Sequence, residues 1–216
     1  MTREDQQRAA ARRAAALVDD GMRVGLGTGS TVGFLLDELA ERHPEARYVA
    51  TSPRTEVEAR RRGLLLTTLD ECPTVDLAID GADQVSPDGW LVKGKGGALT
   101  REKIVARAAA RFVIIVDETK VVDALSAPVP VELLAFGLGA TLSRLAPVQV
   151  RDAARTPDNG VLADYLGAFT SPSALAHWLD TCVGVIEHGL FAPTLVTTIL
   201  VGANDEIHPP LIGDVV

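Results

Sequence analysis

The stretch KGKGGALTREK, residues 93–103, gathers lysines, glycines and a glutamate between a predicted strand and a predicted helix. Glycine lets a backbone approach a ligand closely and adopt positive φ angles, so such a turn can form a polar pocket. Lys93 can neutralise a developing oxyanion, and Glu102 can act as a general base. The alternative is a solvated helix that exposes Arg101, Glu102 and Lys103, which is the better expectation for a charged trio taken alone.

A second chemical motif is GLGTGST, residues 25–31, between an apolar run and a helical pattern. Free N–H groups and hydroxyls at a helix N-terminus can hold a phosphate. The motif lacks the lysine of a P-loop, and Ser30 replaces the third glycine of the dinucleotide fingerprint. We therefore expect a phosphate site here, with an ordinary strand-to-helix turn as the alternative.

A third motif, DGADQV at residues 80–85, places Asp80 and Asp83 at the end of an apolar run. The two carboxylates can bind sugar hydroxyls or transfer protons. They can equally well close an Asx-turn, and the motif alone does not decide between these outcomes.

Composition narrows the possible functions. The chain has 216 residues, is 47% hydrophobic and carries a net charge of −8 without a clustered basic face, which argues against nucleic-acid binding. No apolar run is long enough to span a bilayer, and no secretory leader is recognisable, so we expect a cytoplasmic protein. Cys72, Cys182 and the four histidines match no metal spacing. Carboxylates, lysines and an anion site remain, and this set suits cofactor-free proton transfer on a small phosphorylated molecule.

Apolar strands alternate with helices over the first half of the chain, which predicts a mostly parallel sheet with ligands beyond the carboxyl ends of its strands. We expect Ser30 or Thr31 near the N-cap of the second helix. After a proline-containing connector at 126–136, grouped strands and helices predict a smaller inserted α+β domain. The first predicted domain comprises residues 1–125 and 198–216, and the second comprises residues 126–197. The predicted strands span 22–27, 47–52, 64–69, 75–80, 111–118, 129–136, 148–153, 161–168, 184–191 and 197–203, and the helices span 3–18, 30–43, 55–63, 100–110, 139–146 and 171–182.

Taken together and in this order, GLGTGST, DGADQV, KGKGGALTREK and VDETK closely resemble the ribose-5-phosphate isomerases of the A type. Later segments such as TPDNGVLADY and GVIEHGLF extend the likeness over nearly the whole chain. The resemblance implies a Rossmann-like domain with a smaller ferredoxin-like domain, no metal or cofactor, and a homodimer or homotetramer. It also implies interconversion of D-ribose 5-phosphate and D-ribulose 5-phosphate in the non-oxidative branch of the pentose phosphate pathway.

The resemblance assigns roles to residues of this chain. Glu102 would be the catalytic base that moves a proton between two carbons through an enediolate. Lys93 would offset the oxyanion, and Asp80 and Asp83 would orient hydroxyls. The implied substrate-binding residues are Thr28, Gly29, Ser30 and Thr31 at the phosphate, Gly81 and Ala82 along the sugar, Gly94, Lys95 and Gly96 in the glycine-rich loop, and Lys120.

Three positions depart from the family pattern. Gln84 replaces a frequent glutamate, which we expect to cost little because both aspartates are kept. Lys95 replaces a glycine and adds a cation beside the pocket. Many members carry an N-terminal lysine that contacts the substrate, and here Gln7 or Arg8 would have to replace it.

The motifs admit two other functions. A sugar-phosphate sensor would usually carry a helix-turn-helix segment, which the sequence lacks. An enzyme similar to the CoA-transferases would use Glu102 as a nucleophile and form a covalent adduct that mass spectrometry detects.

Overall fold

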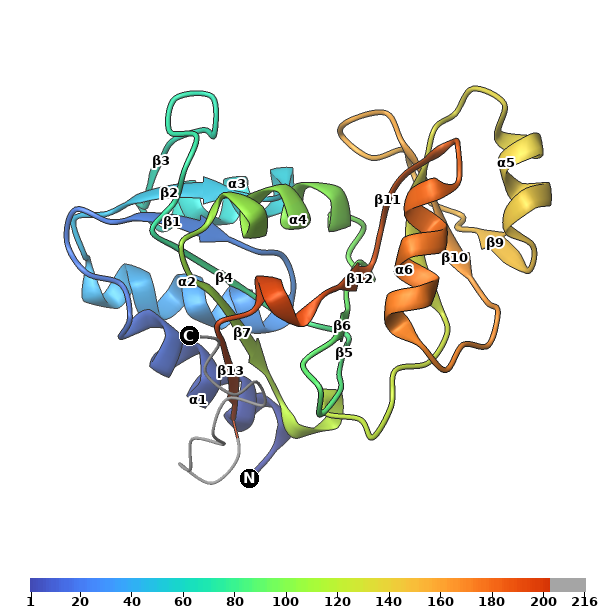
Figure 1. Cartoon of the computed structure of the whole chain (residues 1–216). Coiled ribbons are helices and arrows are strands. Elements are labelled where there is room, and N and C mark those ends of the chain that lie inside the picture. The colour runs from blue at the N-terminus through green and yellow to red at the C-terminus, as the bar shows by residue number, and fades with distance from the viewer. Residues whose placement is uncertain (203–216) are drawn as a thin grey trace.

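A parallel sheet of six strands forms the centre of the larger part of the molecule (Figure 1). The computed structural model describes residues 1–202, so the terminal part of the predicted first domain, 203–216, lies outside the described residues. Numbered along the chain within this sheet, the strand order is 3-2-1-4-5-6, which is the Rossmann order. The strands in spatial order are β3 (Leu65–Leu66), β2 (Arg47–Ala50), β1 (Arg23–Leu26), β4 (Leu77–Asp80), β7 (Phe112–Val116) and β13 (Thr198–Val201), and each neighbouring pair is parallel.

Helices cover both faces of this sheet (Figure 1). Its central strands are continuous apolar runs because both faces are buried. On β4, Leu77 and Ile79 pack toward the first two helices, whereas Ala78 packs in the cluster that contains Val105 of the fourth helix. The helices of this part are α1 (Arg3–Ala15), α2 (Ser30–Arg42), α3 (Pro53–Arg61) and α4 (Leu99–Ala108).

A smaller unit lies between β7 and β13 in the chain and to the right in Figure 1. Its elements follow the order βαββαβ, and its antiparallel sheet has the order 4-1-3-2, which is the ferredoxin-like arrangement. The predicted fold class is therefore confirmed. The elements are β8 (Val129–Leu133), α5 (Leu138–Leu145), β9 (Val148–Val150), β10 (Val161–Tyr165), α6 (Pro172–Thr181) and β11 (Val185–His188).

A third, small sheet connects the two parts. It consists of β5 (Gln84–Val85), β6 (Leu91–Val92) and β12 (Leu190–Phe191), of which β12 comes directly from the end of the smaller unit. Short 3-10 helices at Glu118–Lys120 and Pro193–Leu195 complete the elements of the described chain. Strand β12 leaves the smaller unit and pairs with β6, which precedes that unit in the chain. The domain limits at 126 and 197 stay a prediction.

The N-cap of α2 is Gly29, with a φ of 139°, and Ser30 begins the helix directly after it, so Ser30 lies near the N-cap as expected. The strands predicted at 64–69 and 184–191 differ from the structure. The strand predicted at 64–69 is only two residues long, since Leu65 lies exposed on an edge strand with a single neighbour.

The strand predicted at 184–191 is divided at Gly189. The Gly189 N–H donates to the Pro130 carbonyl, whereas its own carbonyl accepts from the Lys93 N–H, so the chain passes here from one sheet to another. Among residues 1–202, no helix has the length and apolar character that crossing a bilayer requires.

Candidate active site

Loops at the carboxyl ends of the central strands surround a cavity of about 300 Å³. It lies near the neighbouring strands β1 and β4, between which the strand order of the sheet reverses direction. Open α/β sheets bind ligands at such a switch point. Every catalytic or substrate-binding residue that the resemblance assigns by its motifs lines this cavity except Asp80. The lining comprises Thr28, Gly29, Ser30, Thr31, Val32, Gly81, Ala82, Asp83, Lys93, Gly94, Lys95, Gly96, Glu102, Val116 and Lys120, together with Arg3 and Gln7 from α1.

The loop between β1 and α2 presents the start of a helix to the cavity. Ser30, Thr31 and Val32 form its first turn, and the N–H groups of a first turn have no intrahelical partners. Gly27 must be a glycine, because a Cβ there would lie 1.9 Å from the Asp80 carboxylate. The arrangement provides donors and a favourable dipole for an anion.

Thr28 has a different role from its neighbours in this loop. Its hydroxyl lies 2.9 to 3.2 Å from the hydroxyls of Thr51, Ser52 and Thr55, and its N–H donates to Asp80 at 3.1 Å. These contacts fasten the loop to the start of α3. The side chain of Thr28 is therefore engaged within the protein, although the residue lines the cavity.

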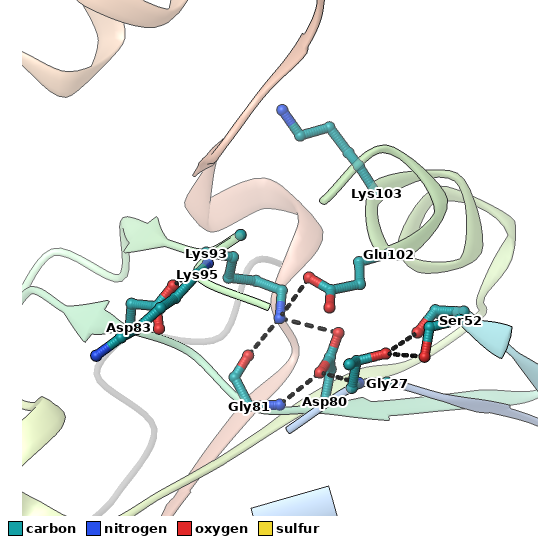
Figure 2. A network of polar contacts seen from close by, with 12 residues as sticks. Gly27, Ser52, Asp80, Gly81, Asp83, Lys93, Lys95, Glu102 and Lys103 are labelled. Carbon is teal, nitrogen blue, oxygen red and sulfur yellow. Dashed lines mark hydrogen bonds and ion pairs between the residues drawn. The ribbon is translucent and has the colours of Figure 1, made fainter. Parts of the chain in front are cut away.

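A buried ion trio forms the floor of the site (Figure 2). The Lys93 ammonium lies 2.9 Å from Asp80 Oδ2 and 3.2 Å from Glu102 Oε2, and it also donates to the Gly81 carbonyl. Asp80 is held in turn by the N–H groups of Thr28 and Gly81. Glu102 Oε2 is buried and faces the Lys93 ammonium without a well-formed hydrogen bond in the described chain, whereas the residue itself lines the cavity.

Burial sets the proton affinities within this trio. The pKa of Glu102 is raised to about 8, because burial and the Asp80 carboxylate outweigh the opposing effect of Lys93. Burial likewise raises the pKa of Asp80, with Lys93 opposing the change. For Lys93, burial acts downward, but the two carboxylates together raise its pKa above the ordinary value. The ammonium thus stays charged while Glu102 can exchange a proton near neutral pH.

Asp83 and Lys95 lie at the exposed side of the site. The N–H of Lys95 donates to Asp83 Oδ2 at 2.9 Å, which fixes that carboxylate beside the glycine-rich loop. Figure 2 shows the Lys95 side chain directed away from Glu102. Of the two lysines in this loop, Lys93 is therefore the one that meets the buried carboxylates.

The end of the cavity near α1 carries a cation that the sequence reasoning missed. Arg3 lines the cavity and pairs with the buried Asp117 at 3.1 Å, and Gln7 donates to the same carboxylate at 2.9 Å. Arg8 instead pairs with Glu4 on the surface. Of the two predicted replacements for the missing lysine, only Gln7 lines the cavity, and the helical spacing of Arg3 and Gln7 was the signal that could have indicated Arg3.

Gln84, the third departure from the family pattern, has a structural contact that explains its type. Its amide nitrogen donates to the Ser126 carbonyl at 3.0 Å, and its amide oxygen accepts from the Ser126 N–H at 2.8 Å. An ionised glutamate could accept but not donate in this pair. Gln84 therefore holds the connector beside β5.

A buried carboxylate–ammonium pair beside a helix N-terminus, at the switch point of a Rossmann-like sheet, fits an α/β enzyme of the sugar-phosphate isomerase class. The model of the family "Ribose 5-phosphate isomerase A (phosphoriboisomerase A)" matches residues 47–206, and the chain belongs to this family. The resemblance stated from the motifs is thereby confirmed.

Individual relatives support the assignment over the full length. The ribose-5-phosphate isomerase A of Lacticaseibacillus paracasei is 44% identical over 95% of this chain and 94% of its own. The crystal structure of ribose 5-phosphate isomerase A from Neisseria gonorrhoeae superimposes with a TM-score of 0.92 at 29% identity, covering 97% of this chain and 98% of that one. A D-ribose-5-phosphate isomerase in complex with phospho-erythronic acid gives a TM-score of 0.90 at 31% identity, covering 96% and 98%.

Proposed function

We propose that this chain interconverts D-ribose 5-phosphate and D-ribulose 5-phosphate by proton transfer through an enediolate. The observation that carries the proposal is the buried pair of Glu102 and Lys93, with 3.2 Å between Oε2 and Nζ, on the wall of a cavity that also contains a helix N-terminus. A base with a raised pKa beside a fixed cation is what an aldose-ketose isomerisation needs without further groups. The activity is that of the family to which the chain belongs.

In the proposed mechanism, Glu102 removes the proton from C2 of the aldose and returns it to C1, while the proton of the C2 hydroxyl passes to the oxygen on C1. Lys93 stabilises the negative charge that develops on the carbonyl oxygen, where water is largely excluded. Asp83, on the open side of the cavity, binds sugar hydroxyls. Asp80 does not line the cavity, and its contact with Lys93 supports a role in fixing the ammonium.

The phosphate of the substrate is proposed to bind between the first turn of α2 and the cations at the α1 end of the cavity. Ser30 and Thr31 supply hydroxyls and N–H groups, and Arg3 and Lys120 supply positive charge. Phosphate binding remote from the reacting carbons can hold the sugar in the reactive geometry.

The proposal is tested by incubating the protein with ribose 5-phosphate in D2O and recording NMR spectra. We expect ribulose 5-phosphate to form, with deuterium at the exchanged carbon. Binding without turnover would instead favour a sugar-phosphate sensor. A covalent adduct on Glu102, seen as added mass, would favour a transferase that uses this carboxylate as nucleophile.

The double substitution Ser30→Ala and Thr31→Ala tests the phosphate loop. We expect KM for ribose 5-phosphate to rise about tenfold or more, since hydrogen bonds to charged groups are worth about 1.5–3 kcal/mol each. The change in kcat should be smaller, because the reacting carbons lie elsewhere. Steady-state kinetics on the folded variant provides the measurement, with Ser143→Ala on α5 as the control. An unchanged KM would show that this loop does not hold the phosphate.

The assembly and location of the protein are also part of this proposal. Phe136 and Val183 are 87% and 84% exposed on the smaller unit, and neighbouring Leu134 is half exposed. Apolar side chains gathered in this way support a homodimer or homotetramer, which light scattering can measure. Free Cys72 and Cys182 support a reducing, cytoplasmic location.

A further inference from the structure

The helix that carries Glu102 is tied to the smaller unit by the residues on either side of that glutamate. The Thr100 hydroxyl donates to Glu132 of β8, and Arg101 forms a two-pronged pair with Asp158 at 2.6 and 2.8 Å. Lys103 reaches β11, which is far away in the sequence. Three side chains of one helical turn therefore bind three separate segments of the smaller unit.

Lys103 is the buried member of this set. Its side chain is 5% exposed, and its ammonium donates to Glu187 Oε1 at 2.6 Å and to the His188 carbonyl at 2.7 Å. It also lies 4.9 Å from the centre of the Phe191 ring. Burying an ammonium is costly unless its partners compensate, so these contacts define its position closely. Figure 2 shows this side chain pointing away from the carboxylates of Glu102 and Asp80.

The segment that receives Lys103 also supports Lys93. The Lys93 N–H donates to the Gly189 carbonyl at 2.8 Å, and the adjacent residues Val92 and Leu190 are paired in the small connecting sheet. A side chain at position 189 is excluded, since its Cβ would lie 2.0 Å from the Lys93 carbonyl oxygen. Segment 187–191 therefore contacts the main chain of Lys93 and, through Lys103, the helix of Glu102.

We propose that Lys103 is a positioning residue for the isomerisation, because it ties the helix of Glu102 to the same segment that holds Lys93. In this arrangement the relative position of base and ammonium depends on one shared support. The inference rests on the proposed function and adds a residue that does not line the substrate cavity. Without Lys103, α4 keeps its apolar packing but loses the polar contact that fixes it along segment 187–191.

A cation site is the other chemistry that this cluster suggests. Atoms of Asp180, Glu187 and His188 that can bind a metal lie within 4.8 Å of one another. Positive charge is already supplied there, because the Lys103 ammonium contacts Glu187 directly.

His188 completes the cluster as a neutral side chain. Its Nδ1 accepts from the Leu190 N–H at 3.2 Å, so Nε2 is the nitrogen that can donate to Asp180 at 3.1 Å. Burial, with the charge of Lys103, lowers the pKa of His188 to about 4. The contacts around Lys103 therefore hold its ammonium in one position against segment 187–191.

The test replaces Lys103 by methionine, which keeps the length and apolar stem but removes the charge and donors. We expect kcat to fall about tenfold or more, since small displacements of a catalytic group can be costly. KM for ribose 5-phosphate should stay within about twofold, because Lys103 does not line the cavity. Arg101→Met is the matched control on the same turn: its ion pair with Asp158 is partly exposed rather than buried, and kcat should stay within about twofold.

A second comparison separates positioning from a general loss of structure. If Lys103 acts through Glu102, then Lys103→Met should leave the residual kcat of a Glu102→Gln enzyme unchanged within about twofold, since effects on one shared group are not additive. A full additional tenfold loss in that background would overturn the proposal. So would an unchanged kcat in Lys103→Met, or a change confined to KM.

Glu187→Gln keeps the inference testable if Lys103→Met does not fold. This variant retains an acceptor for Lys103 but removes the charge, and kcat should fall severalfold with KM preserved. An unchanged kcat would contradict the proposal. Wild-type protein without isomerase activity would instead contradict the proposed function, so the two failures are distinguishable.

Discussion

Replacing Glu102 by glutamine is expected to lower kcat for the isomerisation by about 10²- to 10⁴-fold, a barrier increase of about 3 to 5 kcal/mol. Glutamine keeps the size of glutamate and can still accept a hydrogen bond, but it cannot take a proton from carbon. Glu102 Oε2 lies 3.2 Å from the Lys93 ammonium, and the nearby Asp80 and Asp83 carboxylates oppose the ionisation of this glutamate. Binding of the sugar phosphate should change little, because the phosphate site lies elsewhere in the cavity.

The measurement compares kcat with the dissociation constant of ribose 5-phosphate, obtained by calorimetry, in the same folded variant. Near-normal turnover would exclude Glu102 as the base. Asp83 would then be the next candidate, since it lines the cavity, and Asp80 would follow.

The pH dependence of the wild-type enzyme gives an independent check on Glu102. The base must be ionised, and its pKa is raised from 4.5 to about 8 by burial and by Asp80. We therefore expect kcat/KM to fall as the pH decreases below about 8, whereas an ordinary glutamate would place this fall near pH 4.5. Because Asp80 and Glu102 share the Lys93 ammonium, the pH at which kcat/KM falls belongs to the coupled titration of these two carboxylates. Rates at constant ionic strength between pH 5.5 and 9 would show the limb.

The same shift has a consequence for stability. The folded-state pKa of Glu102 lies above its unfolded value, so its contribution to stability is present below pH 4.5 and is lost as the pH rises through about 8. Glu102→Gln removes this loss. As the pH rises from 5.5 to 8.5, the free energy of unfolding of the variant minus that of the wild type should therefore increase. Urea titrations at several pH values would measure this difference. A difference between the two proteins that does not change with pH would indicate that Glu102 is ionised throughout this range.

Replacing Lys93 by methionine should have the second largest effect, a loss in kcat of about 10²- to 10³-fold. The Lys93 ammonium is the cation that contacts Glu102, and its position is fixed by Asp80 and the Gly81 carbonyl. Without it, the oxyanion of the enediolate loses its buried counter-charge. Removing it also leaves two carboxylates in apolar surroundings, so the variant should be less stable at alkaline pH, where both would ionise.

Lys95 is the matched control for Lys93 because it belongs to the same loop and carries the same charge. Lys95 is exposed, and its side chain is directed away from Glu102 (Figure 2). Lys95→Gly should change kcat by less than about tenfold, or roughly 1.4 kcal/mol. If Lys95→Gly were the more damaging of the two, the ammonium assignment would have to be exchanged between these lysines.

Local sequence patterns were sufficient for most of the fold. The apolar runs of β4 and β7 are recognisable because both faces of a parallel strand are buried, and the helices between them show their own periodicity. The motif that begins at Gly25 and the two aspartates at the end of the run that forms β4 indicated the switch point of the sheet, since parallel strands bring their carboxyl ends to one edge. The ferredoxin-like unit came from the resemblance of the whole set of motifs.

Only the tertiary structure decided what each polar side chain contacts. The spacing of Asp80 and Asp83 cannot show that Asp80 lies beneath the cavity, because that depends on Lys93 from another loop. Arg3 lines the cavity and Arg8 does not, although both belong to α1, because the docking of the helix decides which face meets the site.

Lys103 gives the clearest contrast. In the sequence it is one charge in an exposed-looking trio, whereas in the structure it is buried against Glu187 and His188. Periodicity along a chain reflects interactions between near neighbours, and it therefore predicts helices and strands. The environment of a side chain is made by segments that are distant in the sequence, so burial, pKa and pairing are determined only when those segments pack together.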